Sequence, residues 1–314
     1  MAEEQGTTAS GVIQDVATLD LTYAQSAAEL SHITLIKDVA TIIIPESLNG
    51  ALARIPMADV ASIVPVPEGE RVKQHVGMVT VGGDALADPS QEGVILVVIG
   101  ALVITSPVTV VRYSQIIVTG VVLAPQGSES ALGAGLSRVT GAVEYYKYGE
   151  GQNIKTFSGQ TKLSGEVLAN PGGTPDDLLL VTGQLLITTP IRELGFQQIY
   201  LSGQLMAPRD SQTVLGPALR VQGQVCWYAG ENPRFFLGDE RFGQAFFELL
   251  DEPVSLVLLG NTEIEADVRP ETLKEKVADI ALAGDIKAPK SVIPVLQLLA
   301  TEKYGDISVL EDDI

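Results

Sequence analysis

Few side chains in this 314-residue chain are of the types that do chemistry. His32 and His75 are its only histidines, and Cys226 is its only cysteine. A zinc site needs several imidazole or thiolate ligands around one ion, and a catalytic thiol needs a basic neighbour that lowers its pKa. The two histidines fall two repeat units apart, about 10 Å, and the nearest charges to Cys226 in the sequence are Glu231 and Arg234. We therefore expect neither a metal site nor thiol catalysis.

Three pairs of neighbouring carboxylates could serve as a general acid and a general base. They are Asp176 with Asp177, Asp239 with Glu240, and Asp251 with Glu252. Adjacent residues of an extended chain point to opposite sides, so we interpret these pairs as solvated acidic loops. The chain also has no CxxC, HExxH or phosphate-loop motif. We expect no catalytic residue, no cofactor and no enzyme. The alternative is a repeat enzyme or cation-binding protein that uses acidic residues along one face.

The charge balance of the chain limits its partners. Its 39 acidic and 20 basic residues give a net charge of −19 and a pI near 4.4. Such a protein repels phosphate backbones, so nucleic acid is not an expected partner. The start, MAEEQGTTASGVIQD, is acidic where a secretory signal is basic and then apolar. With one cysteine, the chain also fits a reducing compartment, and we expect a cytoplasmic location.

The elements that would position these residues recur along the sequence. GALVITSPVTVVRYSQIIVTGVVLAP, residues 100–125, matches GQLLITTPIRELGFQQIYLSGQLMAP, residues 183–208, at ten of 26 positions without a gap. This predicts a duplicated block of about 82 residues, 95–177 and 178–260. The apolar run that starts at Val94 contains a Ser-Pro step, and the second, less apolar copy of the block has a Thr-Pro step at the same position. We therefore expect a strand there and no membrane span.

A shorter period lies inside this block. A glycine or aspartate between alternating apolar residues recurs with gaps of 18 to 24 residues and one gap of 37. These positions are Asp38, Asp59, Gly82, Gly100, Gly120, Gly141, Gly165, Gly183, Gly203, Gly223, Gly260, Gly284 and Gly305. Alternation predicts a strand, the proline that follows ends it, and the fixed period predicts stacked parallel strands. We expect a mainly β fold with short helices, a parallel β-solenoid of about 13 coils.

Two features refine the expected coil. Proline followed by glutamate begins a helical pattern in PESLNGALARI from Pro45 and in PETLKEKVADI from Pro270. The strand glycine either admits close approach of the next coil or makes a plain turn. In KDVATIII and ADVASIV, we expect the side chain of Asp38 or Asp59 to replace the freedom of glycine by a local hydrogen bond, with cation binding as the alternative.

IYLSGQLMAPRDSQTVL resembles a leucine-rich repeat in its alternating strand and short return, and the spacing extends over residues 33–309. The chain lacks the asparagine that such repeats place after the strand. LSGEVLAN and LAGDIKAP also look like the glycine-punctuated β-helix of the bacterial, polymer-forming bactofilins. Both resemblances imply a solenoid, and neither implies a particular activity.

The predicted organisation is an N-terminal cap at 1–32, one solenoid domain at 33–309 and an acidic tail at 310–314. The long gap predicts an insertion at 226–253 that is rich in aromatic residues. A candidate interface lies there and at the matching tyrosines of the first half: Trp227, Tyr228, Phe235, Phe236, Phe242, Phe246, Phe247, Tyr145, Tyr146 and Tyr148. The alternative is a helix whose stripe of Phe242, Phe246 and Leu249 packs on the solenoid.

These observations favour a non-enzymatic structural or protein-interaction protein. The end coils of a solenoid expose unpaired strand edges, so a protein partner or self-association is expected. The charged end EDDI disfavours endless stacking. We therefore expect small homo-oligomers or lateral pairing, with filaments as the alternative.

Overall fold

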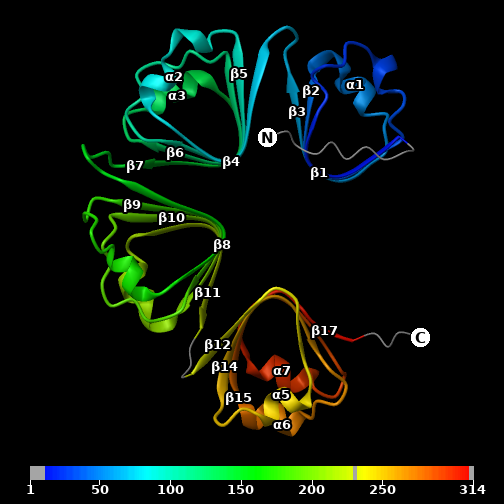
Figure 1. Ribbon diagram of the computed structural model, residues 1–314, viewed down its shortest axis with the longest axis vertical. Helices are drawn as coiled ribbons and strands as arrows, with labels where there is room; N and C mark the ends of the chain where they lie inside the picture. The colour runs from blue at the N-terminus through cyan, green and yellow to red at the C-terminus, as the bar shows by residue number, and fades with distance from the viewer. Residues whose placement is uncertain (1–10, 229–231, 311–314) are drawn as a thin grey trace. The chain divides into compact units, whose positions relative to one another are not determined.

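A computed structural model describes residues 11–228 and 232–310 of the chain, which are mainly parallel β-strands joined by short helices and loops (Figure 1). Sheet A contains β1 (Val12–Asp20), β2 (Leu35–Pro45) and β3 (Met57–Val66). Sheet B contains β4 (Arg71–Val81), β5 (Val94–Ile104), β6 (Gln115–Pro125) and β7 (Leu136–Tyr146). Sheet C contains β8 (Ile154–Leu163), β9 (Leu178–Ile187), β10 (Gln198–Pro208) and β11 (Leu219–Tyr228). Sheet D contains β12 (Pro233–Leu237), β13 (Glu240–Phe242), β14 (Val254–Ile264), β15 (Val277–Ala288), β16 (Ala300–Tyr304) and β17 (Ile307–Val309).

Short helices lie in the connections between strands. The α-helices are α1 (Asn49–Leu52), α2 (Gly83–Leu86), α3 (Glu129–Gly135), α4 (Gln212–Leu215), α5 (Gln244–Glu248), α6 (Pro270–Lys276) and α7 (Ile293–Leu299). Turns of 3-10 helix cover Ala27–Leu30, Glu46–Leu48, Pro89–Gln91, Gly165–Ala169 and Arg209–Ser211. The helices predicted after Pro45 and at Pro270 are confirmed. Within the described ranges, no helix has the length and apolar character that crossing a membrane requires.

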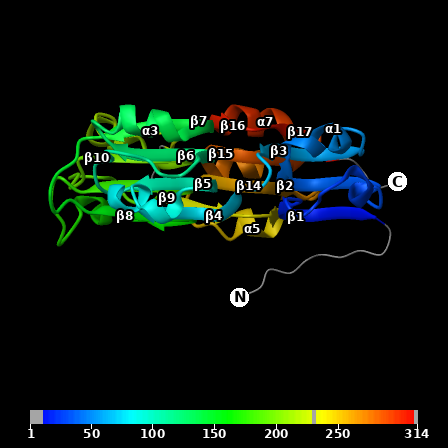
Figure 2. The same ribbon diagram turned by 90° about the horizontal axis from the view of Figure 1, so that it is seen from above.

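The chain divides into two compact units, residues 1–148 with sheets A and B, and residues 149–314 with sheets C and D. Within each sheet the strands are parallel and largely in register, as predicted. The ladder is interrupted between sheets, so the strands form separate stacks and one continuous solenoid is not confirmed. Figure 2 shows the strands of each sheet layered one above the next. The predicted N-terminal cap, residues 1–32, contains β1, and the tail at 311–314 lies outside the described ranges.

The break between sheets A and B has a local cause. A coil normally returns through a helix or loop, but only four residues separate the end of β3 at Val66 from the start of β4 at Arg71. Pro65 and Pro67 remove backbone donors at this point, and Gly69 has a φ of +82°. The chain therefore turns into a new sheet instead of pairing with β3. The last strands of the two sheets lie side by side, because Arg138 of β7 donates to the carbonyl of Ile63 in β3.

A column of glycines bends the strands of sheet B at one level. Gly77, Gly100, Gly120 and Gly141 are partners in register, and the last three have φ between +132° and +138°. A Cβ on Gly120 would lie 1.8 Å from the carbonyl oxygen of Gly100. Close approach of the neighbouring coil therefore requires glycine, and the plain-turn interpretation is wrong at this position.

Two of the predicted column positions are wrong. Gly82 has an extended φ of −79° and precedes α2, while Gly165 begins a 3-10 turn. Their places in the columns belong to Gly77, which pairs with Gly100, and to Gly159, which pairs with Gly183. The motif fits the glycine inside each of these strands and also the glycine just after it, because apolar residues lie shortly before both. Only strand pairing distinguishes them.

Aspartates replace the glycines in sheet A. Asp15, Asp38 and Asp59 have φ of +59°, +52° and +54°, the left-handed conformation that aspartate tolerates. The register of the flanking residues places the three at the same level of the sheet. Aspartate therefore takes the left-handed conformation at the level where the other sheets have glycine, while the local hydrogen bond expected of Asp38 and Asp59 stays a prediction. The charge on Asp38 contacts Lys37, whose Nζ lies 3.3 Å from its carboxylate.

The apolar run from Val94 is explained by burial of both faces of β5. Leu96, Val98 and Leu102 point into the core enclosed by sheet B and its helices. Ile95 and Val97 point the other way and pack against a cluster from sheet A that includes Ile43 and Val64. A parallel strand that is covered on both sides reads as a continuous apolar run.

Sheets B and C carry corresponding hydrogen bonds at corresponding residues. The hydroxyl of Tyr146 donates to the carbonyl of Ile104 at 2.9 Å, and that of Tyr228 donates to Ile187 at 2.7 Å. The side chains of Ser128 and Ser211 likewise accept from the amides of Val108 and Ile191, respectively. The two matching segments are therefore stabilised by equivalent buried side-chain hydrogen bonds to the backbone.

Candidate interaction surface

In the second unit, the first strands of both sheets lie on one side and the last strands on the other. Lys162 of β8 and the residues of β12 line one common pocket, so these two strands are neighbours. On the other side, Arg209, next to sheet C, forms an ion pair with Glu302 of β16 at 3.1 Å. We call the surface of β8 and β12 the leading face and the surface of β11 and β16 the trailing face. Each face presents strands with an unpaired edge within the described residues.

The apolar core of sheet C is incompletely covered at both faces. Core residues of the inner strands, such as Val181 and Leu201, are at most 2% exposed. Their counterparts on the outer strands are only half-buried, namely Phe157 and Leu163 on β8 and Leu219, Val221, Val225 and Trp227 on β11. Sheet B of the first unit shows the same pattern, with half-buried Val79 and Val81 on β4 and Val139, Val143 and Tyr145 on β7. Among residues 11–228 and 232–310, no further strand pairs with these outer strands.

A ladder of glutamine side chains crosses sheet C beside its glycine column. Gln160 donates to Gln184, Gln184 to Gln204, and Gln204 to Gln224, at 2.9, 2.9 and 3.0 Å. Such amide ladders stabilise in-register parallel strands. Within the described residues, the ladder leaves an acceptor free on Gln160 at the leading face and a donor free on Gln224 at the trailing face. The sequence analysis missed these residues. The signal was present in the repeated Gly-Gln of SGQT, TGQL, SGQL and QGQV.

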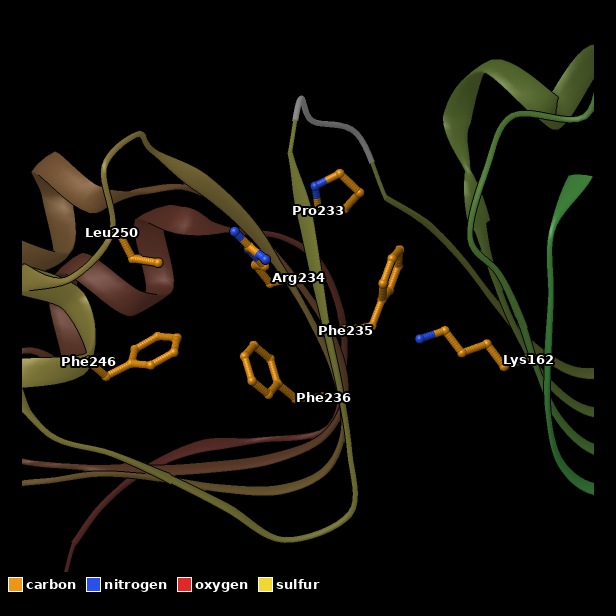
Figure 3. Close-up of a pocket in the computed structure, with 7 residues that line it drawn as sticks. All are labelled: Lys162, Pro233, Arg234, Phe235, Phe236, Phe246 and Leu250. Atoms are coloured by element: carbon orange, nitrogen blue, oxygen red, sulfur yellow. The ribbon is translucent and has the colours of Figure 1, made fainter.

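A pocket of about 420 Å³ opens on the leading face (Figure 3). Phe235 and Phe236 of β12 point to opposite sides of their strand, with Phe235 toward Lys162 and Phe236 toward Phe246. The Nζ of Lys162 lies 5.2 Å from the ring centroid of Phe235, a cation–π distance. Arg234 also lines the pocket and is exposed. The leading face is therefore apolar with a positive rim.

The trailing face has an acidic group at the corresponding place. Glu302 lies near buried Cys226, whose pKa is raised to about 12 by burial and then by the charge of Glu302, against a smaller opposing effect of Arg209. At that pKa the thiol is protonated at neutral pH. Cys226 points into the cluster between sheets C and D, while Val225 and Trp227 belong to the core of sheet C, because successive side chains of a strand point to opposite faces.

Four of the ten predicted interface residues pack into the core of sheet D, namely Phe236, Phe242, Phe246 and Phe247. Phe247 is 0% exposed and Phe242 is 4% exposed. Their rings form a chain of contacts with Phe236 and Phe246 at centroid distances of 4.5 to 6.2 Å. The predicted single helix with a stripe of Phe242, Phe246 and Leu249 is wrong in detail. Phe242 lies in β13, α5 covers only Gln244–Glu248, and Leu249 is 82% exposed.

The remaining predicted interface residues are divided between core and surface. Tyr146 and Tyr228 are buried with their hydroxyls bonded, whereas Tyr148 is 40% exposed. Trp227 and Tyr145 are half-buried on the last strands of sheets C and B. The expected long insertion at 226–253 contains the two short strands β12 and β13, which begin sheet D. Gly238, with φ +110°, occupies the column position beneath Gly260.

The residues considered for chemistry do not meet. His32 precedes β2 and His75 lies in β4, so they belong to different sheets. Among residues 11–228 and 232–310, no three histidine, cysteine or acidic side chains are placed to hold a metal ion. Asp176 is exposed while Asp177 is buried. The members of that pair therefore point apart.

Asp177 organises the loop before β9. It accepts hydrogen bonds from the side chains of Asn170 and Thr174 and from the backbone amides of Thr174 and Asn153. Burial alone would raise its pKa, but these bonds outweigh burial and hold the pKa well below its ordinary value. Asn170 itself has a φ of +55° and donates to Gly195 in the next coil. The carboxylate therefore ties neighbouring coils together.

Acidic side chains gather most closely on sheet D. A second pocket of about 520 Å³ is lined by Asp239, Glu240, Glu263 and Asp285, together with Arg241, Asn261, Thr262 and Lys287. Arg241 pairs with Glu263 at 2.8 Å, and Asn261 donates to Asp239 at 3.0 Å. Two of the four acidic side chains, Glu263 and Asp239, are therefore already paired with a basic or an amide side chain.

Comparison of the chain with protein-family models, with curated proteins and with solved structures finds no match.

Proposed function

We propose that this protein is a non-enzymatic structural protein that associates through the open ends of its parallel sheets. The observation that carries the proposal is the half-burial of apolar side chains on the outer strands. Val221, Val225 and Trp227 occupy core positions on β11, and within the part of the chain that the structure describes no further strand pairs with β11 to cover them. Covering such side chains with a further strand buries apolar surface and pairs the strand edge at the same time.

Each sheet with its helices is, in this proposal, a short solenoid segment of leucine-rich-repeat-like coils. The in-register glycine column and the glutamine ladder support this interpretation. Such stacks require a cap or a partner at each end, because each coil buries its core only against its neighbours. The outer strands lack a cap within the described residues, so a protein partner or another copy is the expected cover.

Size-exclusion chromatography with light scattering tests this function, with negative-stain imaging at several protein and salt concentrations. We expect species larger than one chain that dissociate on dilution. A strictly monomeric protein at millimolar concentration would exclude self-association. An interaction function would then require that the outer strands bind another protein. The test is a pulldown with the unchanged protein and with a Val221→Asp variant, which should no longer bind that protein.

A further inference from the structure

We propose that the trailing face of the second unit binds the leading face of a second copy of this chain, head to tail and in register. This inference rests on the proposed function and names its partner. It commits to the pairing of β11 with β8 of the second copy and of β16 with β12 of the second copy. The parallel ladder of each sheet would continue across the joint with the spacing that it has inside the chain.

The glutamine ladder gives the joint its polarity. Gln224 ends the ladder with a free donor and Gln160 begins it with a free acceptor, so two copies in the same orientation complete one bond. Reversal of all the amides would exchange donor and acceptor and leave the ends complementary. Two leading faces or two trailing faces would instead oppose like groups. A ladder with unlike ends therefore favours head-to-tail association over a symmetric dimer.

The apolar columns of sheet C continue across the same joint. The register places Phe157 in the column of Val181, Leu201 and Val221. It places Leu163 in the column that ends at Trp227. Val221 would thus cover Phe157 of the second copy, and Trp227 would cover its Leu163. All four side chains are half-buried in the single chain and would become part of one core.

The glycine column continues as well. A Cβ on Gly159 would meet nothing within 4 Å, whereas one on Gly183 would lie 2.4 Å from the carbonyl oxygen of Gly159. In sheet C each column glycine carbonyl lies where the Cβ of the next column glycine would be, so by the same pattern the carbonyl of Gly223 would face the next copy. Gly159 of a second copy would then approach the carbonyl of Gly223 in the same way that Gly183 approaches the carbonyl of Gly159 within the chain. The Lys155 charge does not obstruct the approach, because it bonds to Asn170 and lies over the Phe196 ring of its own chain.

One pair of opposite charges would meet at the joint, Lys162 on sheet C of one copy and Glu302 on sheet D of the other. Lys162 lies in the column that ends at Cys226, and Phe235 lies in the column that ends at Glu302. Head-to-tail stacking therefore brings Lys162 of the second copy onto the acidic group beside Cys226. Each copy keeps one unused face, so the assembly is open-ended. This differs from the small oligomers that the sequence predicts from EDDI, whose residues lie outside the described ranges.

A charge-swap mixing experiment tests the polarity. Glu302→Lys places a lysine near Lys162 of the next copy, which would lie over Cys226, and Lys162→Glu places a glutamate near Glu302. We expect each variant alone to associate at least tenfold more weakly than the unchanged protein. Mixed in equal amounts, they should recover assembly, because both alternating joints then pair opposite charges. The readout is weight-average mass by light scattering.

Several outcomes overturn the proposal. If either variant alone assembles like the unchanged protein, the head-to-tail joint is wrong. The same holds if the mixture does not regain the weight-average mass of the unchanged protein. Self-association itself would not be excluded by either result. If the unchanged protein never associates, self-association fails as well, and only capture of another protein through the outer strands would keep the interaction role. Gln224→Glu provides a second test, since it keeps the acceptor for Gln204 but loses the outer donor. We expect weaker assembly, with Gln222→Glu as the equally charged control on the same strand. Equal effects of the two would exclude the amide joint.

Discussion

Replacement of Gly203 by alanine should be among the most costly single changes in the second unit. A Cβ at this position would lie 1.9 Å from the carbonyl oxygen of Gly183, about 1.5 Å inside ordinary contact distance. That oxygen belongs to a paired central strand and cannot move without breaking the ladder. The φ of +139° adds backbone strain on the order of 1–3 kcal/mol for any residue with a Cβ. Clash and strain together should lower the free energy of unfolding by about 4 kcal/mol or more.

Gly172→Ala is the matched control. Gly172 has a φ of +78° in an exposed turn, and a Cβ there would meet nothing within 4 Å. Strain alone should cost about 1 kcal/mol. Urea unfolding followed by fluorescence of Trp227, the only tryptophan, reports on the strand paired with β10. Similar costs for the two substitutions would refute the steric role of the glycine column.

Three further predictions concern the buried groups. Phe247→Ala should lower the free energy of unfolding by about 3–5 kcal/mol, because the Phe247 side chain is buried. Leu249→Ala should change it by no more than about 0.5 kcal/mol, because Leu249 is exposed. Calorimetry or urea titration compares the two variants. Asp177 has a folded pKa below its unfolded value, so its stabilisation is present above about pH 4 and lost as the pH falls further. Asp177→Asn should flatten this part of the acid-unfolding curve, and an unchanged curve would contradict the assignment. Cys226 should react with a thiol reagent at neutral pH only after denaturant is added, since burial keeps its pKa near 12; rapid labelling of the native protein would contradict its burial.

The sequence predicts the strands well because their cause is local. Alternating apolar residues around glycine, followed by proline, determine strands such as β6 and β10, and Pro-Glu determines the start of α6. The division into sheets depends instead on where a link is too short to return the chain. Column residues are spaced 20 to 24 apart within sheets, but only 18 apart from Asp59 to Gly77 and from Gly141 to Gly159. This signal is visible only once Gly77 and Gly159 are chosen over Gly82 and Gly165.

The candidate surface was harder to predict for a different reason. A cluster of aromatic residues is easily seen in a sequence, but it does not show whether the side chains point to the surface or to the core. Phe242 and Phe247 point into the core. The residues that distinguish the two faces, Gln160 and Gln224, are ordinary polar residues in the sequence. Their importance comes from register, since four strands must align before their amides form one ladder. Strand pairing is a long-range property that local pattern does not determine.

The strong negative charge of the chain does not prevent the association that we propose. Most of the charged residues on the strands of the two faces, β8, β11, β12 and β16, are basic. They are Lys155, Lys162, Arg220, Arg234 and Lys303, and the one acidic residue on these strands is Glu302. The excess acid that gives a net charge of −19 therefore lies away from the joint. Repulsion between whole copies acts over longer distances and is screened beyond about 8 Å at physiological ionic strength, whereas contacts within the joint are screened much less. Burial of the apolar columns is insensitive to this screening, so added salt should favour assembly by weakening the repulsion more than the contacts.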